Sequence, residues 1–156
     1  MKGNEKIIAV LNDFLADELT AISQYMVHSE MCANWGYDKL HEAVEKRAVG
    51  EMKHAEKLIA RILFLEGQPL VSNLNKMEIG ATVEAQLKYD LAAEAGAIQA
   101  YNDGIRLCIE LGDSGSRELI EDNLEDEEEH LDWLETQLDQ INQMSLQNYL
   151  LAQVKE

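Results

Sequence analysis

The sequence predicts an all-α protein: a four-helix bundle with one long crossover between its second and third helices and a short fifth helix at the C-terminus. Apolar residues recur at the spacing of an amphipathic helix through four long segments. Two short glycine-containing breaks divide these segments into pairs, and a longer connection that contains the only proline separates the pairs. Because 156 residues are enough to bury a core, we expect one domain, 1–156.

The four long segments form two predicted helical hairpins. Trp35-Gly36 interrupts the first pair of segments, and Gly112-Asp113-Ser114-Gly115 interrupts the second. Because each break is short, the two helices of each pair are expected to run antiparallel. The helices are predicted at residues 5–34, 38–65, 82–111 and 116–143.

The connection between the hairpins sets the predicted topology. It opens at Gly67-Gln68-Pro69. Its length of about fifteen residues reaches ~50 Å when extended, whereas a thirty-residue helix is ~45 Å long. The connection can therefore cross the whole bundle and make the second and third helices parallel. The fifth helix is predicted at residues 145–154, from Leu146, Tyr149, Leu150 and Val154.

The two halves of the chain repeat one another at an offset of 76 residues. The offset relates unusual residues and the turns as well as apolar positions. We infer two copies of one helical hairpin, related by a pseudo-twofold axis. The related pairs are Glu18 and Glu94, Tyr25 and Tyr101, Cys32 and Cys108, Gly36 and Gly112, Glu51 and Glu127, and His54 and His130.

A Glu-x-x-His spacing occurs once in each half. Side chains three positions apart lie about 60° apart around a helix, so Glu51 and His54 share one face. Leu40, Val44 and Leu58 lie on that same face, so it is predicted to point into the core. The other three glutamates of the repeat also lie on apolar faces, at Glu18, Glu94 and Glu127.

Four glutamates on core-facing positions predict a metal site. Burying each carboxylate costs several kcal/mol unless positive charge compensates it. Lysine and arginine are too few on these faces, Arg47 being the clearest, whereas two divalent ions bring four positive charges to one place. The alternative is a set of solvated carboxylates held in salt bridges, since glutamate is abundant and residues 125–129 are all acidic.

Two carboxylates, two Glu-x-x-His pairs and a four-helix bundle are the pattern of the ferritin-like di-iron family. The chain resembles that family over its full length, and within it the bacterioferritins, in MKGNEKII, GEMKHAEKLIARILFLEG, DEEEHLDWLETQLD and LQNYL. The resemblance implies two iron ions per subunit, with these catalytic and metal-binding residues: Glu18 and Glu94 as terminal ligands, Glu51 and Glu127 as bridges, and His54 and His130 each completing one iron. It also makes Tyr25 and Asp90 candidates for residues that contact the ligands, Asp90 by orienting a histidine.

The function implied by the resemblance is iron storage and detoxification. Fe(II) would be oxidised by dioxygen or hydrogen peroxide, a ferroxidase reaction, and mineral would collect in a homo-oligomeric 24-subunit shell built from twofold dimers. The negative charge fits, because acidic surfaces attract iron. The alternatives are a soluble di-iron or di-manganese redox enzyme acting on peroxide and a stress-type ferritin that coats DNA. The assembled mass distinguishes the three.

Met52 is predicted to face away from the metal site. It lies about 100° around the helix from Glu51, on an outward apolar stripe with Ile59 and Leu63. A matching stripe on the first helix, formed by Ile8, Leu19 and Met26, suggests a twofold subunit interface with Met52 against its copy. The resemblance implies haem b at this methionine, about one per two subunits, carrying electrons to the ferric core during iron release. A ferredoxin-type reductase is the candidate electron donor. The alternative is that Met52 only fills space.

The resemblance and the spacing lead to predictions for several further positions. Lys46 and Gly50 stand where some bacterioferritins have a histidine and an aspartate that bind an additional iron, so we do not expect that site here. His28 and His41 lack a partnered spacing and are predicted to be surface histidines. The resemblance also suggests an acidic pore lined by Asn34, Glu66, Asp132 and Asp139.

The composition of the chain excludes some classes of binding partner and indicates its cellular compartment. A net charge of −17 argues against nucleic acid and anionic membranes as partners, since both repel an acidic surface. No segment reads as a membrane span or a signal peptide. Cys32 and Cys108 form no Cys-x-x-Cys pair, and as isolated core cysteines they suggest a cytoplasmic protein.

Overall fold

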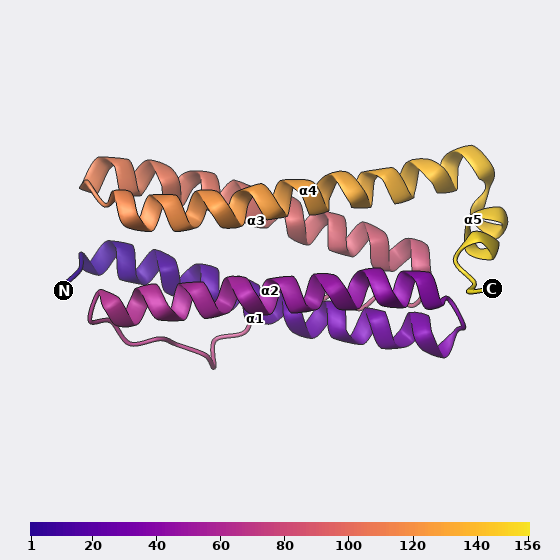
Figure 1. Ribbon diagram of the computed structural model, residues 1–156, viewed down its shortest axis with the longest axis horizontal. Coiled ribbons are helices and arrows are strands. Elements are labelled where there is room, and N and C mark those ends of the chain that lie inside the picture. Colours follow the sequence, from indigo (N-terminus) through magenta and orange to yellow (C-terminus); the bar gives the residue numbers. More distant parts are fainter.

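The computed structural model describes residues 1–156 as five helices and no strands. The four long helices form a bundle in which each hairpin is antiparallel, and α5 lies across the end where α1 finishes and α2 starts (Figure 1). The predicted fold class is confirmed. None of the helices has both the length and the apolar composition needed to cross a bilayer. The bounds are α1 Glu5–Asn34, α2 Asp38–Phe64, α3 Val83–Leu111, α4 Ser114–Met144 and α5 Leu146–Ala152.

Side-chain caps fix where three of the helices begin. Asn4 accepts a hydrogen bond from the Lys6 amide at the start of α1, and Thr82 does the same for α3. Asp113 accepts from the amide of Ser116 at 3.0 Å, which satisfies a free N–H group of α4. Because this cap follows Gly112 directly, α4 begins at Ser114, two residues before the predicted start.

The crossover between the hairpins, residues 65–82, runs along α1 and brings the chain back to the end where α2 began (Figure 1). As a result α3 runs parallel to α2, as the predicted topology requires. Polar side chains on one side of α1 hold the backbone of the crossover in place. These hydrogen bonds run from the amide of Leu70 to Asn12, from Asn75 to Thr20, from Glu78 to Gln24 and from Gly80 to His28.

The prediction that His28 lies on the surface is wrong. Its side chain is completely buried, and its Nε2 accepts a hydrogen bond from the Gly80 amide at 3.0 Å. Nδ1 therefore carries the proton and donates to Asp90 at 2.9 Å. The histidine joins α1, the crossover and α3, which explains its burial. His41 is partly exposed, with 23% of its side chain accessible.

The apolar core is divided into two main clusters by a polar layer. One cluster, which includes Leu11, Phe14 and Ile62, fills the end of the bundle nearest the N-terminus. The other, which includes Leu40 and Leu134, fills the end covered by α5. Cys108 lies in the first cluster and Cys32 in the second, both free, and burial raises the pKa of each thiol to about 11. The layer between the clusters holds the six predicted metal ligands.

Two glycines of α3 allow a test of how closely the hairpins pack. A Cβ atom on Gly104 would lie 2.5 Å from the buried ring of Phe14, whereas one on Gly96 would meet nothing within 4 Å. Gly104→Ala should therefore lower the free energy of unfolding by ~1–3 kcal/mol. Gly96→Ala should raise it by up to ~1 kcal/mol, because alanine is the better helix former. Urea denaturation measures both, and equal stability of the two variants would contradict this packing.

Candidate metal centre

Six ligand-type side chains from all four long helices meet between the two apolar clusters. They form two groups, in each of which one atom per residue lies within 4.8 Å of the others. The two carboxylates shared by both groups have the arrangement expected of bridging ligands, and each group adds one further glutamate and one histidine. The first group is Glu18, Glu51, His54 and Glu127, and the second is Glu51, Glu94, Glu127 and His130.

The burial of these residues fits a pair of metal ions. All six are at most 4% exposed. Three carboxylate oxygens, Glu18 Oε2, Glu51 Oε1 and Glu94 Oε2, are buried without any hydrogen-bond partner. A buried, unpaired carboxylate oxygen is costly in free energy, and coordination to a cation removes that cost. Carboxylate and imidazole ligands suit iron and manganese.

The two histidines hold the carboxylates at opposite ends of the site. His54 Nδ1 lies 3.0 Å from Glu127 Oε1, 3.4 Å from Glu51 Oε2 and 3.6 Å from Glu18 Oε2. His130 Nδ1 lies 2.8 Å from Glu94 Oε1. In both residues Nδ1 therefore faces the carboxylates, and it is the nitrogen placed to bind a metal.

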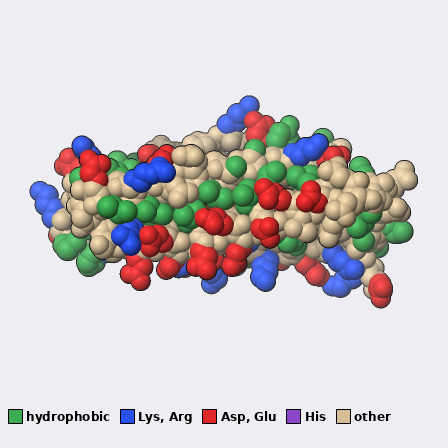
Figure 2. Space-filling model, turned by 90° about the horizontal axis from the view of Figure 1, so that it is seen from above, with side chains coloured by type: hydrophobic (Ala, Val, Ile, Leu, Met, Phe, Trp, Pro, Cys, Tyr) green, Lys and Arg blue, Asp and Glu red, His purple; other side chains and the backbone are tan.

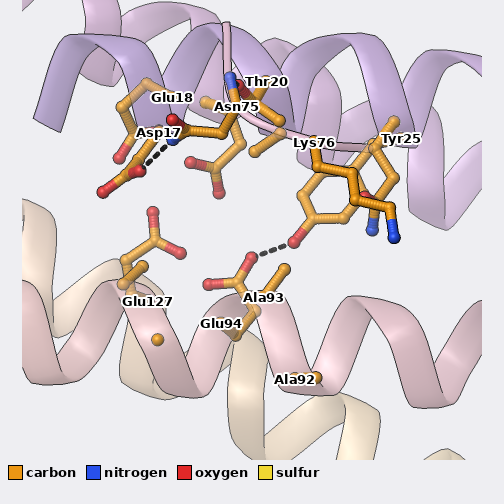
Figure 3. A pocket seen from close by; sticks show the side chains of 15 residues that line it. Asp17, Glu18, Thr20, Tyr25, Asn75, Lys76, Ala92, Ala93, Glu94 and Glu127 are labelled. Atoms are coloured by element: carbon orange, nitrogen blue, oxygen red, sulfur yellow. Dashed lines mark hydrogen bonds between the residues drawn. The ribbon is translucent and has the colours of Figure 1, made fainter. Parts of the chain in front are cut away.

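Two tyrosines contact the carboxylates that are not shared. The hydroxyl group of Tyr25, on α1, donates to Glu94 on α3, as Figure 3 shows. The hydroxyl group of Tyr101, on α3, donates to Glu18 on α1. Tyr25 was a candidate from the sequence, whereas Tyr101 was not, although the 76-residue repeat already paired the two tyrosines. Each tyrosine fixes a glutamate supplied by the other hairpin.

Burial and crowding of like charges make the metal-free site hold protons. Burial raises the pKa of Glu18, Glu51 and Glu127, and it raises the pKa of Glu94 to about 7. Burial by itself lowers the pKa of His54, but hydrogen bonds to Glu127, Glu18 and Glu51 outweigh it and raise that pKa. The site is therefore a strong attractor for cations.

A cavity of about 310 Å³ reaches the site between α1, α3 and the crossover. Figure 3 shows Glu18, Glu94 and Glu127 pointing into it, with Asp17 and Asn75 joined by a hydrogen bond at its edge. The α3 wall consists of small residues, Ala92, Ala93, Gly96 and Ala97. The cavity has room for a metal ion and a small oxidant.

Comparison with known proteins agrees with this geometry. A family model described as a ferritin-like domain matches residues 8–144. The chain is 42% identical to a bacterioferritin of Rhodobacter capsulatus, over 97% of this chain and 94% of the relative. It is 40% identical to bacterioferritins of Brucella melitensis and Mycobacterium leprae, over 96% of this chain and 92% and 94% of those relatives. The chain belongs to the bacterioferritin family.

Met52, the predicted haem ligand, lies on the surface of the chain. Its side chain is 43% exposed, whereas its neighbours Glu51 and His54 are buried. Leu63, on the same predicted stripe of α2, is 58% exposed, and Met26 on α1 is 54% exposed. In a single chain this apolar face is uncovered, which fits the predicted subunit interface.

The remaining predicted site residues lie outside the metal centre. Asp90 is buried and does orient a histidine, but that histidine is His28 and not a member of the metal groups. The same oxygen, Asp90 Oδ1, also accepts a hydrogen bond from Gln24 Nε2 at 2.8 Å, so Asp90 ties α3 to α1. The four predicted pore residues are all exposed and are not brought together within one chain: Asn34, Glu66, Asp132 and Asp139.

Sequence reasoning missed Asp126. Its Oδ2 lies 2.8 Å from His54 Nε2, so it holds the side of the ring that faces away from the carboxylates. Asp126 stands in the acidic run 125–129, where nothing distinguishes it from its neighbours, and it is half exposed. Only the packing of α4 against α2 identifies it.

The raised pKa values predict how the metal-free chain responds to pH. Between the ordinary glutamate pKa of 4.5 and the folded value of about 7 for Glu94, the folded chain binds more protons than the unfolded chain. Its free energy of unfolding should therefore fall as pH rises through this window. His54 acts in the same direction, and only His130, whose pKa burial lowers, opposes them. Urea denaturation at pH 5 to 8 measures the trend.

A matched variant and added metal provide the controls. Glu94→Gln should flatten the pH dependence, because the amide does not titrate. Saturating Co(II) should also flatten it, since the metal replaces the protons. A metal-free chain that became more stable from pH 5 to pH 7 would contradict the electrostatics described for this site.

Proposed function

We propose that this chain stores and detoxifies iron in the cytoplasm. It acts as a ferroxidase that oxidises Fe(II) with dioxygen or hydrogen peroxide and deposits the mineral in a 24-subunit shell of twofold dimers. The observation that carries the proposal is the pair of overlapping ligand groups within one chain, joined by Glu51 and Glu127. Membership in the bacterioferritins supports the storage role.

The six ligands would hold two Fe(II) ions, and neighbouring tyrosines would keep the terminal carboxylates in place. Glu18 and His54 would hold one ion, Glu94 and His130 the other, and the two shared carboxylates would bridge them. Two bound Fe(II) ions would supply the two electrons that reduce dioxygen to hydrogen peroxide, or hydrogen peroxide to water. The tyrosine hydroxyl groups restrain the terminal carboxylates, which limits the reorganisation needed when the charge of the ions changes.

The acidic surface supports delivery of iron. Figure 2 looks onto the side of α3 and α4 and shows acidic side chains along the length of the bundle, with basic ones between them. The net charge of −17 makes the field around the chain attractive to cations. We propose that Asn34, Glu66, Asp132 and Asp139 of neighbouring subunits come together to line an entry pore. Each is exposed and available for such a junction.

Removing a ligand tests the ferroxidase reaction. Glu18→Ala and Glu127→Ala should each abolish the fast oxidation of Fe(II) and lower its rate by roughly 10-fold to 100-fold or more, because Glu18→Ala removes a ligand of one metal position and Glu127→Ala removes a ligand shared by both. Glu128→Ala is the matched control, since that neighbouring glutamate is exposed and belongs to neither ligand group. Stopped-flow absorbance after mixing with Fe(II) in air measures the rate. Oxidation at the unaltered rate in Glu18→Ala, with the shell assembled, would contradict the assignment.

We also propose that the outward face of α1 and α2 forms the twofold interface and binds haem b through Met52, one sulfur from each subunit. The exposure of Met52, Met26 and Leu63 supports this, because such an apolar face is unfavourable in water. A haem with two methionine ligands has no open position for substrate, so its role would be to carry electrons from a ferredoxin-type reductase to the ferric core.

The haem proposal has a direct test. Haem-replete expression should give a Soret band at about one haem per two chains. Met52→Leu should remove the band and leave the assembly intact, because leucine keeps the volume and lacks the sulfur ligand. Met26→Leu is the matched control, as it changes an exposed methionine of the same face and should retain haem. Full haem content in Met52→Leu would show that Met52 only packs at the interface and does not bind haem.

A further inference from the structure

The metal centre follows the 76-residue repeat closely. Each terminal glutamate accepts from a tyrosine of the opposite hairpin, Tyr25 with Glu94 and Tyr101 with Glu18. Each histidine directs Nδ1 at the carboxylates. A strictly symmetric site would give its two metal positions equal affinities, so any departure from the symmetry distinguishes one position from the other.

One interaction departs from the repeat. His54 Nε2 lies 2.8 Å from Asp126 Oδ2. The residue related to Asp126 by the offset of 76 is Gly50, which has no side chain to accept a hydrogen bond. His130 Nε2 makes no hydrogen bond, and its ring is held only by Nδ1 and by contacts with Tyr25 and Trp133, whose ring centroids lie 5.4 and 6.1 Å away.

His130 lines an open pocket. The pocket, of about 510 Å³, lies between α2 and α4, and its lining includes Arg47, Gly50, Asp126 and His130. Gly50 is not required for close packing, since a Cβ atom there would meet only Arg47 Nη1, at 3.9 Å. In the middle of a helix glycine costs ~1 kcal/mol relative to alanine. The glycine therefore leaves space beside His130 without any gain in packing.

A hydrogen-bond acceptor behind a ligating histidine has known consequences. It fixes the tautomer and the ring orientation and makes the ligating nitrogen more basic, and its loss lowers metal affinity by roughly 10-fold to 100-fold. Asp126 supplies such an acceptor to His54, whereas no side chain or backbone group of the chain supplies one to His130.

We propose that the two metal positions are unequal, with tight binding at Glu18 and His54, where Asp126 is a positioning residue. Weaker binding at Glu94 and His130 leaves that ion free to exchange with the solution. This inference rests on the proposed di-iron function. In this arrangement the ion held by Glu18 and His54 stays bound, whereas the ion held by Glu94 and His130 is delivered and released.

Calorimetric titration of the assembled, metal-free chain with Co(II) tests the inequality without relying on oxidation. A chain in which all six ligands are changed to alanine reports binding to surface carboxylates, which is subtracted. The wild-type chain should bind two equivalents in two classes that differ by roughly 10-fold to 100-fold in affinity. Asp126→Ala should weaken the tight class until the two classes merge. In Asp126→Asn the affinity of the tight class should lie between those of the wild-type and Asp126→Ala chains, because the amide oxygen still accepts a hydrogen bond from His54 Nε2.

The reciprocal variant completes the test. Gly50→Asp should tighten the weak class, whereas Gly50→Ala, which adds only a methyl group, should leave it unchanged. Two equivalents of equal affinity in the wild-type chain would overturn the inequality and leave the di-iron proposal standing, whereas fewer than two equivalents would overturn the di-iron proposal itself. An unchanged tight class in Asp126→Ala, or equal tightening by Gly50→Ala and Gly50→Asp, would remove the role given to these residues.

Discussion

The burial of four carboxylates and two imidazoles in the middle of an apolar bundle is the constraint on which the rest of this structure depends. Each carboxylate loses its hydration and gains like-charged neighbours, so the metal-free site retains protons at pH values where exposed glutamates have lost them. Tyr25 and Tyr101 satisfy one oxygen on each terminal glutamate, but three oxygens stay without a partner. Only cations at the centre satisfy the whole set.

The fold meets this constraint by drawing ligands from every long helix. Two copies of one hairpin face each other across a pseudo-twofold axis, and the copies can do so only if α2 and α3 run parallel. The crossover makes this possible, and the row of polar side chains on α1 holds it in place through Thr20, Gln24 and His28. Apolar clusters above and below the site then provide the packing energy that offsets the polar layer.

The sequence predicted the helices, the crossover and the residues that converge, because helical periodicity reveals which face of a helix is buried. It did not predict partners on other helices, which depend on how the helices are rotated against each other. For this reason His28 was assigned to the surface, although it binds both the crossover and Asp90. Tyr101 and Asp126 were missed for the same reason. The repeat could have identified Tyr101 through Tyr25, whereas no symmetry argument leads to Asp126, whose counterpart is Gly50.

The most direct test is a crystal structure of the chain loaded anaerobically with Fe(II), with anomalous scattering recorded on both sides of the iron absorption edge. The structure described here predicts two iron peaks in each subunit, both bounded by Glu51 and Glu127, one beside His54 and the other beside His130. A single peak, or iron bound only at surface carboxylates while these six residues retain their metal-free contacts, would contradict a di-iron centre in this chain.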